Sequence, residues 1–191
     1  MWLGHLLWIG GIILGVKNVK EKGNNFERKV AKLLSEWSGV KFMRTPSSGA
    51  IHNFKDKRVV SDIVPPLSIG EFPFSIECKC VECSWEFSAI IENTSQNLRD
   101  HWSQAVDDAN RENLRPMLIF SKNFRDIFIA IRKCDYNIMS LNIINCIFSY
   151  SEDRDTLVIF KMKDFFGGIS CENLMGSFSV KNTDKGTVEK N

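Results

Sequence analysis

The stretch Phe72-Pro-Phe-Ser-Ile-Glu-Cys-Lys-Cys-Val81 decides the fold, and it follows Asp62 after a short proline-containing interval. Its apolar and aromatic content predicts a strand. Side chains alternate along a strand, so Glu77 and Lys79 share one face and Cys78 points to the other. The apolar face of this strand is formed by Phe74, Ile76, Cys78 and Cys80.

Asp62, Glu77 and Lys79 suggest a metal site. Two carboxylates and an ammonium that converge on one spot are costly unless a cation lies between the acids. Mg²⁺ prefers carboxylate oxygens and keeps several waters, so it suits such a site and the hydrolysis of phosphodiesters. The alternative is a solvated face, because Glu-x-Lys is also common on exposed strands and short motifs match by chance.

An amphipathic helix precedes these residues. Asn24 or Asn25 is a candidate N-cap, and Gly39 is a stop signal. Glu27 lies at the margin of the apolar stripe, where it is either a third carboxylate of the site or an acid stabilised by the helix dipole in a first turn. The stripe itself recurs at helical spacing and consists of Phe26, Val30, Leu33, Leu34 and Trp37.

A short strand over residues 40–45 and a loop follow the helix. Arg44, Ser47 and Ser48 can contact a phosphate through side chains and backbone amides. Pro, Ser and Gly also dominate ordinary turns, which is the simpler explanation of this loop. The next segment is basic, with Lys55, Lys57 and Arg58, and a strand is expected over residues 59–64.

These motifs occur in a recognisable order. Gly23-x-x-Phe26-Glu27, Arg44-x-x-x-Ser48-Gly49, Ser61-Asp62-Ile63 and Ile76-Glu77-Cys78-Lys79 together resemble the PD-(D/E)xK nuclease superfamily. Within it the chain is most similar to archaeal-type Holliday junction resolvases and their viral relatives, over roughly residues 22 to 81. The resemblance implies an α/β fold: a restriction-endonuclease-like core in which a central mixed β-sheet is flanked by helices.

The resemblance also implies roles for the matching residues. Asp62, Glu77 and the backbone carbonyl of Cys78 would hold one or two Mg²⁺ ions, for which Mn²⁺ can substitute. Lys79 would orient the attacking water, and Glu27 would complete the outer shell or bind a second ion. Ser48 matches the family's serine. Two departures are visible: Ser61 replaces the usual proline, and the segment between Gly49 and Asp62 is long and basic.

The rest of the chain predicts a helix over residues 97–110 and further strands. The helix would bury Trp102, Ala105, Val106 and Ala109. Gln104 on it is a further candidate for the site, although a solvent-facing glutamine is the simpler expectation. Lys122 follows a strand over residues 116–120 and is a candidate phosphate contact. Other apolar runs predict strands at 127–131, 143–148 and 157–162.

Composition sets bounds on the domain and its compartment. A chain of 191 residues, 43% hydrophobic, fits one domain, which we expect over residues 20–178. Residues 179–191 are polar and predict a flexible tail. The six cysteines, without a secretory context, indicate an intracellular protein, and Cys78, Cys80 and Cys83 lack the fourth ligand of a closed zinc site.

The apolar segment 1–19 is the unusual part of the chain. It is short for a bilayer span and lacks the basic start of a signal peptide. We expect it to be peripheral to the fold and to come from a start codon placed too far upstream. A single membrane anchor is the alternative.

Charge distribution favours a polyanionic partner. Residues 17–58 carry eleven Lys or Arg and four Asp or Glu, whereas residues 82–113 carry seven acids and two arginines. A basic region around the proposed site suits DNA. The resemblance to the junction resolvases implies a homodimeric, metal-dependent endonuclease for branched DNA such as Holliday junctions, with no small-molecule cofactor and no membrane partner. The alternatives are a nuclease for duplex or single-stranded DNA and a non-catalytic DNA-binding accessory protein.

Overall fold

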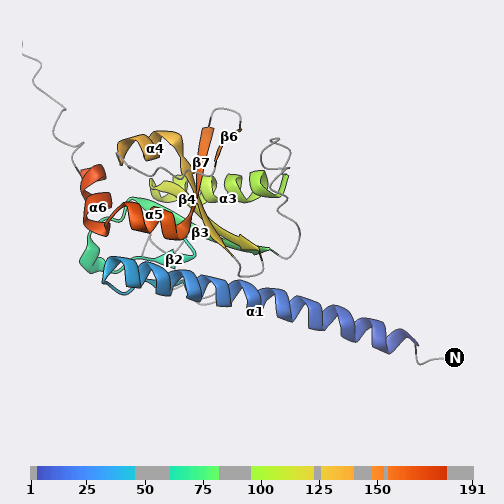
Figure 1. Cartoon of the computed structure of the whole chain (residues 1–191). Helices are drawn as coiled ribbons and strands as arrows, with labels where there is room; N and C mark the ends of the chain where they lie inside the picture. The colour runs from blue at the N-terminus through green and yellow to red at the C-terminus, as the bar shows by residue number, and fades with distance from the viewer. Residues whose placement is uncertain are drawn as a thin grey trace, which may run out of the picture.

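The computed structural model describes residues 4–45, 61–81, 96–122, 126–139, 148–152 and 155–179. These residues form an α/β fold in which helices cover both faces of a mixed sheet (Figure 1). The expected fold class is confirmed.

The central sheet has the strand order β3-β4-β5-β7-β6. Strands β3 (Phe74–Val81) and β4 (Arg115–Lys122) run parallel, whereas β5 (Ile127–Arg132), β7 (Asp155–Lys161) and β6 (Phe148–Glu152) join by antiparallel pairing. The parallel pair needs a crossover connection, and the helix α3 (Gln96–Glu112) lies within it. This arrangement makes β3 the strand at one end of the sheet.

The two faces of β3 meet different helices. Phe74, Ile76 and Cys78 are buried in the core cluster that includes the inner face of α1 (Gly4–Ser38). On the opposite face α3 packs against the sheet, and Trp102 is 3% exposed there. The alternation expected along this strand is therefore confirmed, and Glu77 lies on the α3 face.

Three further helices, α4 (Lys133–Ile138), α5 (Met162–Gly168) and α6 (Cys171–Ser179), pack on the α1 face of the sheet. These helices were not expected from the sequence. The Trp37 indole donates a hydrogen bond of 2.9 Å to the carbonyl of Ile169, which ties α1 to the segment between α5 and α6. The C-terminal helices thus close the core over the end of α1.

Helix α1 begins far upstream of the expected N-cap. The helix is continuous from Gly4, so the prediction of a start at Asn24 or Asn25 was wrong. The two side chains bind arginines instead: Asn24 Oδ1 accepts from Arg44 Nη2 at 2.7 Å and Asn25 Oδ1 accepts from Arg28 Nη1 at 2.7 Å. In Figure 1 the N-terminal half of α1 runs out past the sheet.

Two of the expected strands are short. Strand β1 (Met43–Arg44) pairs antiparallel with β2 (Ile63–Val64), and the 3₁₀ helix η3 (Leu67–Ile69) follows. The strand expected over 143–148 lies mostly outside the described residues, and β6 begins at Phe148. The small β1–β2 sheet matters because it carries Arg44 and places Asp62 beside β3.

Within the part of the chain that the structure describes, no helix combines the length and the apolar character needed to cross a membrane.

Candidate active site

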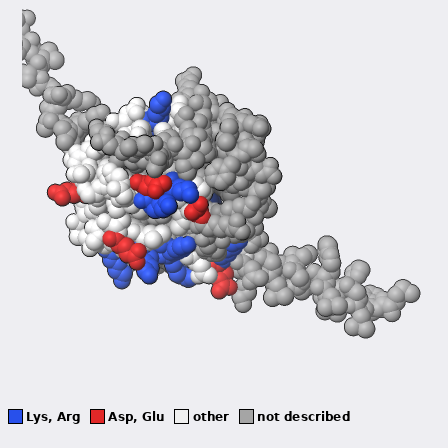
Figure 2. Space-filling view, in the orientation of Figure 1, with Lys and Arg blue, Asp and Glu red and all other residues white. Residues whose placement is uncertain are grey.

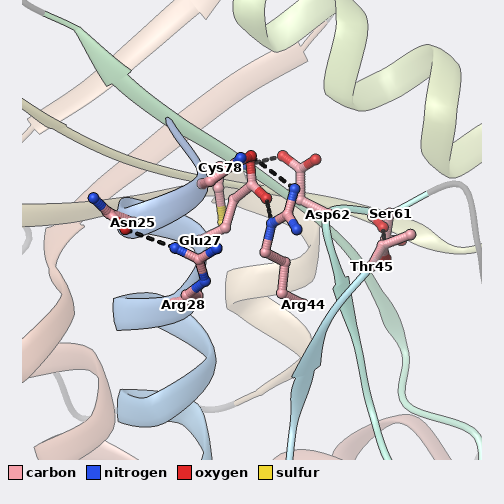
Figure 3. A network of polar contacts seen from close by, with 9 residues as sticks. Asn25, Glu27, Arg28, Arg44, Thr45, Ser61, Asp62 and Cys78 are labelled. Atoms are coloured by element: carbon pink, nitrogen blue, oxygen red, sulfur yellow. Dashed lines mark hydrogen bonds and ion pairs between the residues drawn. The ribbon is translucent and has the colours of Figure 1, made fainter. Parts of the chain in front are cut away.

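Backbone hydrogen bonds on both sides position Asp62. Its N–H donates to the carbonyl of Ile76 at 3.0 Å, and its carbonyl accepts from the N–H of Thr45 at 2.9 Å. The carboxylate then turns toward β3, where Oδ2 accepts from the N–H of Cys78 at 2.8 Å (Figure 3). Asp62 is thereby fixed against the strand that carries Glu77.

Ser61, which stands where the resembling family has proline, is buried and paired. Its hydroxyl lies 2.7 Å from the hydroxyl of Ser75 on β3, and its carbonyl accepts a hydrogen bond from the Thr45 hydroxyl. A buried hydroxyl needs such partners because an unsatisfied one is costly. The departure from proline therefore adds a side-chain tie between the segment before Asp62 and β3.

Glu77 is buried, with 4% of its surface exposed, and two donors hold it from the α3 face. The Lys79 ammonium forms an ion pair with Glu77 Oε1, and the Gln104 amide of α3 donates to the same oxygen at 2.9 Å. Although much of Gln104 lies in solvent, its amide reaches the site. The structure thus brings together the strand motif and the candidate glutamine from the helix.

The carboxyl groups of Asp62 and Glu77 lie close enough to interact. Burial, and then the charge of Glu77, raises the pKa of Asp62 from 3.8 to about 7. Burial also raises the pKa of Glu77, against the opposing effect of Lys79. Burial is the larger cause in both cases, so each carboxylate is costly to ionise in the folded chain without a cation beside it.

Glu27 approaches the site from α1 and carries its own cation. The Arg44 guanidinium pairs with it through Nε (Figure 3). Arg44 Nη2 donates to Asn24. The two charged side chains are only 19% and 16% exposed, for Arg44 and Glu27 respectively. Sequence analysis expected Arg44 at a phosphate, whereas in the structure its guanidinium contacts Glu27 and Asn24.

Several predicted DNA contacts cannot be placed. Lys122 ends β4, and its side chain lies outside the described residues. The remaining predicted contacts lie wholly outside them: Ser47, Ser48, Lys55, Lys57 and Arg58.

Three residues near the site were not singled out by sequence. Asn24 was interpreted only as a cap. His101, one helical turn before Gln104, has a pKa lowered by burial and by Lys79. Asp108, one turn after Gln104, is among the charges that raise the pKa of Glu77. The spacing of His101 and Asp108 could have shown that both share a helix face with Gln104. It could not have shown that this face packs against β3.

The donor set fits a hard divalent cation. Among the described residues, no three His, Cys, Asp or Glu side chains group closely enough to hold a metal by themselves. Mg²⁺, however, is commonly held by one or two carboxylates and several waters, which matches the Asp62 and Glu77 pair. Burial raises the pKa of the Cys78 thiol well above its usual value, so this residue does not supply a thiolate.

Comparison with known proteins identifies the family. Residues 18–176 match the family described as "Phage putative PDDEXK endonuclease". Protein D14 of Escherichia phage T5 is 30% identical over 124 residues, which cover 61% of this chain and 72% of Protein D14. No solved structure matches the chain. With its α/β fold and its acid–lysine strand, the chain belongs to the phage PDDEXK endonucleases, a family of nucleases.

Proposed function

We propose that this protein is an Mg²⁺-dependent endodeoxyribonuclease that cuts branched DNA, with Holliday junctions as its principal substrate. The observation that carries the nuclease chemistry is the buried pair Asp62 and Glu77, with Lys79 bound to Glu77 on the same face of β3. The preference for branched DNA rests on the order of motifs that resembles the junction resolvases.

Asp62, Glu77 and the Cys78 carbonyl would hold the ion, and Mn²⁺ would substitute for Mg²⁺. When bound, such an ion polarises a phosphate and lowers the pKa of a bound water. The raised pKa of Asp62 supports this assignment, because a carboxylate that resists ionisation alone gains most from a cation.

The chain's own side chains orient and balance the reaction. Lys79 would offset charge that builds on the phosphate and orient the attacking water, for which it can stay protonated. Gln104 would keep Glu77 in position through its 2.9 Å hydrogen bond, as the outer partners of metal ligands commonly do. Glu27 would act from the outer shell, beside Arg44.

A basic surface beside the site would bind the DNA backbone. Figure 2 shows Lys and Arg side chains, with some acids between them, along the lower edge, where α1 runs in Figure 1. The exposed basic residues of α1 include Lys20, Arg28, Lys29 and Lys32. DNA affinity that depends on such contacts falls as salt rises. The other proposed contacts are Ser47, Ser48, Lys55, Lys57, Arg58 and Lys122.

The substrate test compares four DNAs in parallel: a four-way junction, a flap, a linear duplex and a single strand. We expect the junction to be cut fastest with Mg²⁺, and Asp62→Asn to bind the junction but not cut it. Equal rates on all four would refute the junction preference in favour of a general nuclease. Binding without cleavage by the wild type would indicate a DNA-binding accessory protein instead.

Two symmetric cuts across a junction need two sites, so we propose a homodimer. Sedimentation of the protein alone and with junction DNA tests this proposal. One chain per junction at saturating protein would contradict it.

A further inference from the structure

We infer that Arg44 takes the place of a second metal ion beside Glu27, so that the site binds one divalent cation, at Asp62 and Glu77. The inference rests on the proposed metal-dependent function and goes beyond it by setting the number of ions. It follows from the way in which charge is distributed among the three acids and the two bases.

The charge of Glu27 is already balanced. Arg44 Nε contacts its carboxylate directly, and both side chains are less than one-fifth exposed. In contrast, the Lys79 ammonium forms its ion pair with Glu77, and the Asp62 carboxylate accepts a hydrogen bond from the backbone N–H of Cys78. The unbalanced negative charge therefore lies at the Asp62 and Glu77 pair.

Arg44 is also fixed more firmly than Lys79. Its planar guanidinium contacts Glu27 through Nε and Asn24 through Nη2, at 2.7 Å from Asn24 Oδ1. A guanidinium does not lose its proton in proteins, so it stays a cation at every working pH. Lys79 is a point charge on a flexible stem, which can move when another cation arrives.

A second ion would have to displace Arg44 from Glu27. The guanidinium would then lose its carboxylate in a partly buried place, which is strongly unfavourable. Asn24 is a positioning residue in this scheme, because it accepts from Arg44 and keeps Nε directed at Glu27. One divalent ion also changes the net charge of the three acids, Lys79 and Arg44 from −1 to +1, which suits a bound phosphate.

The test counts Mn²⁺ ions on the full-length protein without DNA, by electron paramagnetic resonance of free Mn²⁺ at pH 8. We expect one ion per wild-type chain. Asp62→Asn should weaken its binding at least about 30-fold, within the range known for loss of metal-site partners, whereas Glu27→Gln should change it less than about 3-fold. Equal losses in the two variants would overturn the inference.

Arg44→Gln supplies the opposite test. We expect it to bind a second, weaker Mn²⁺, and Arg44→Lys to bind one as the wild type does. Adding Glu27→Gln to Arg44→Gln should remove the second ion. Thermal unfolding confirms that each variant is folded, and a folded Arg44→Gln chain that still binds one ion would refute the role of Arg44.

The outcomes separate this inference from the proposed function. Two Mn²⁺ ions on a wild-type chain that cleaves DNA would refute the inference alone. A wild-type chain that binds no Mn²⁺ and cuts no DNA would refute the proposed function as well.

Discussion

At the scale of single residues, the burial of like charges dominates the site. Asp62 and Glu77 lie close together, and each has its own partners. The Cys78 N–H donates to Asp62, whereas Lys79 and Gln104 bind Glu77. Proteins tolerate such pairs where a ligand relieves the repulsion. The free-energy cost of burying the two carboxylates can therefore be measured on the metal-free protein.

Removing the charge of Asp62 should stabilise the metal-free protein at alkaline pH. A carboxyl whose folded pKa is raised from 3.8 to about 7 destabilises the fold fully above pH 7 and not at all below pH 4. Asp62→Asn should thus gain about 2 to 4 kcal/mol at pH 8, and much less at pH 5. Urea unfolding with a chelator measures this. Glu36→Gln, at an exposed acid, is the control and should change little at either pH.

Metal binding should weaken as the pH falls below about 7. Protons compete with the ion for Asp62, whose pKa is raised to about 7, so the Mg²⁺ needed for half-maximal cleavage should rise roughly tenfold for each unit of pH below that value. Kinetics between pH 5.5 and 8.5 at several Mg²⁺ concentrations measure it. A requirement that stays constant over this range would contradict the proton competition.

Gln104 should matter for turnover more than for DNA affinity. Gln104→Leu removes the amide that donates to Glu77 Oε1 at 2.9 Å, and we expect kcat to fall about 10-fold or more with little change in KM. Ser103→Ala, at the exposed neighbouring position, is the matched control. If KM alone changed, Gln104 would act as a DNA contact instead.

At the scale of elements, the site is assembled where β2, β3 and α3 meet. Strand β3 presents Glu77 and Lys79 to α3, and the backbone of Asp62 is bonded to Ile76 on the same strand. Helix α3 is held on the sheet by its buried side, and Trp102 and Leu98 are nearly inaccessible there. Loss of this packing should therefore disturb the glutamine that α3 carries.

Trp102→Ala tests how far α3 supports the site. Emptying a buried aromatic position should lower the free energy of unfolding by about 3 to 5 kcal/mol. Cleavage by the folded fraction should fall too, because Gln104 is two residues away on the same helix. Chemical unfolding and single-turnover cleavage measure the two effects, and Trp102→Phe should restore most of both. A stable Trp102→Ala protein would show that α3 is not anchored there.

At the scale of the whole molecule, the basic edge along α1 lies beside the acidic site. Exposed α1 side chains such as Arg28 and Lys29 belong to the same helix as Glu27, which faces inward to Arg44. A phosphate backbone bound along α1 would therefore pass close to the acids. Salt dependence gives this arrangement a quantitative test.

Replacing two of these cations should weaken DNA binding without changing the chemical step. Arg28→Gln combined with Lys29→Gln should reduce the slope of log affinity against log salt by about 2, one for each lost phosphate contact. Single-turnover cleavage at saturating protein should be unchanged. The matched control is Lys133→Gln with Lys163→Gln, two exposed lysines on α4 and α5. Equal slopes in the two double variants would exclude α1 as a DNA contact.

The alternating faces of β3 could be predicted because apolar periodicity is a local property. The mixed α/β core was expected from the resemblance to the PD-(D/E)xK nucleases. The start of α1 was predicted wrongly because Asn24 and Asn25 suit a cap by residue type, whereas in the structure their side chains bind arginines within a longer helix. One of these arginines, Arg44, comes from strand β1, which the sequence could not show. The short helices after β7 were also missed. Each is short and has few apolar residues. Which side of each helix is buried becomes clear only from its packing against α1 and the sheet.

The chemical groups of the site can be read from the chain: three acids, a lysine and a glutamine, in the order of a PD-(D/E)xK nuclease. Their pairing depends on the fold. It assigned Arg44 to Glu27, and both Lys79 and Gln104 to Glu77. The physical reason is that the interaction of charges depends on distance and burial, which arise when residues far apart in the sequence meet in the folded chain.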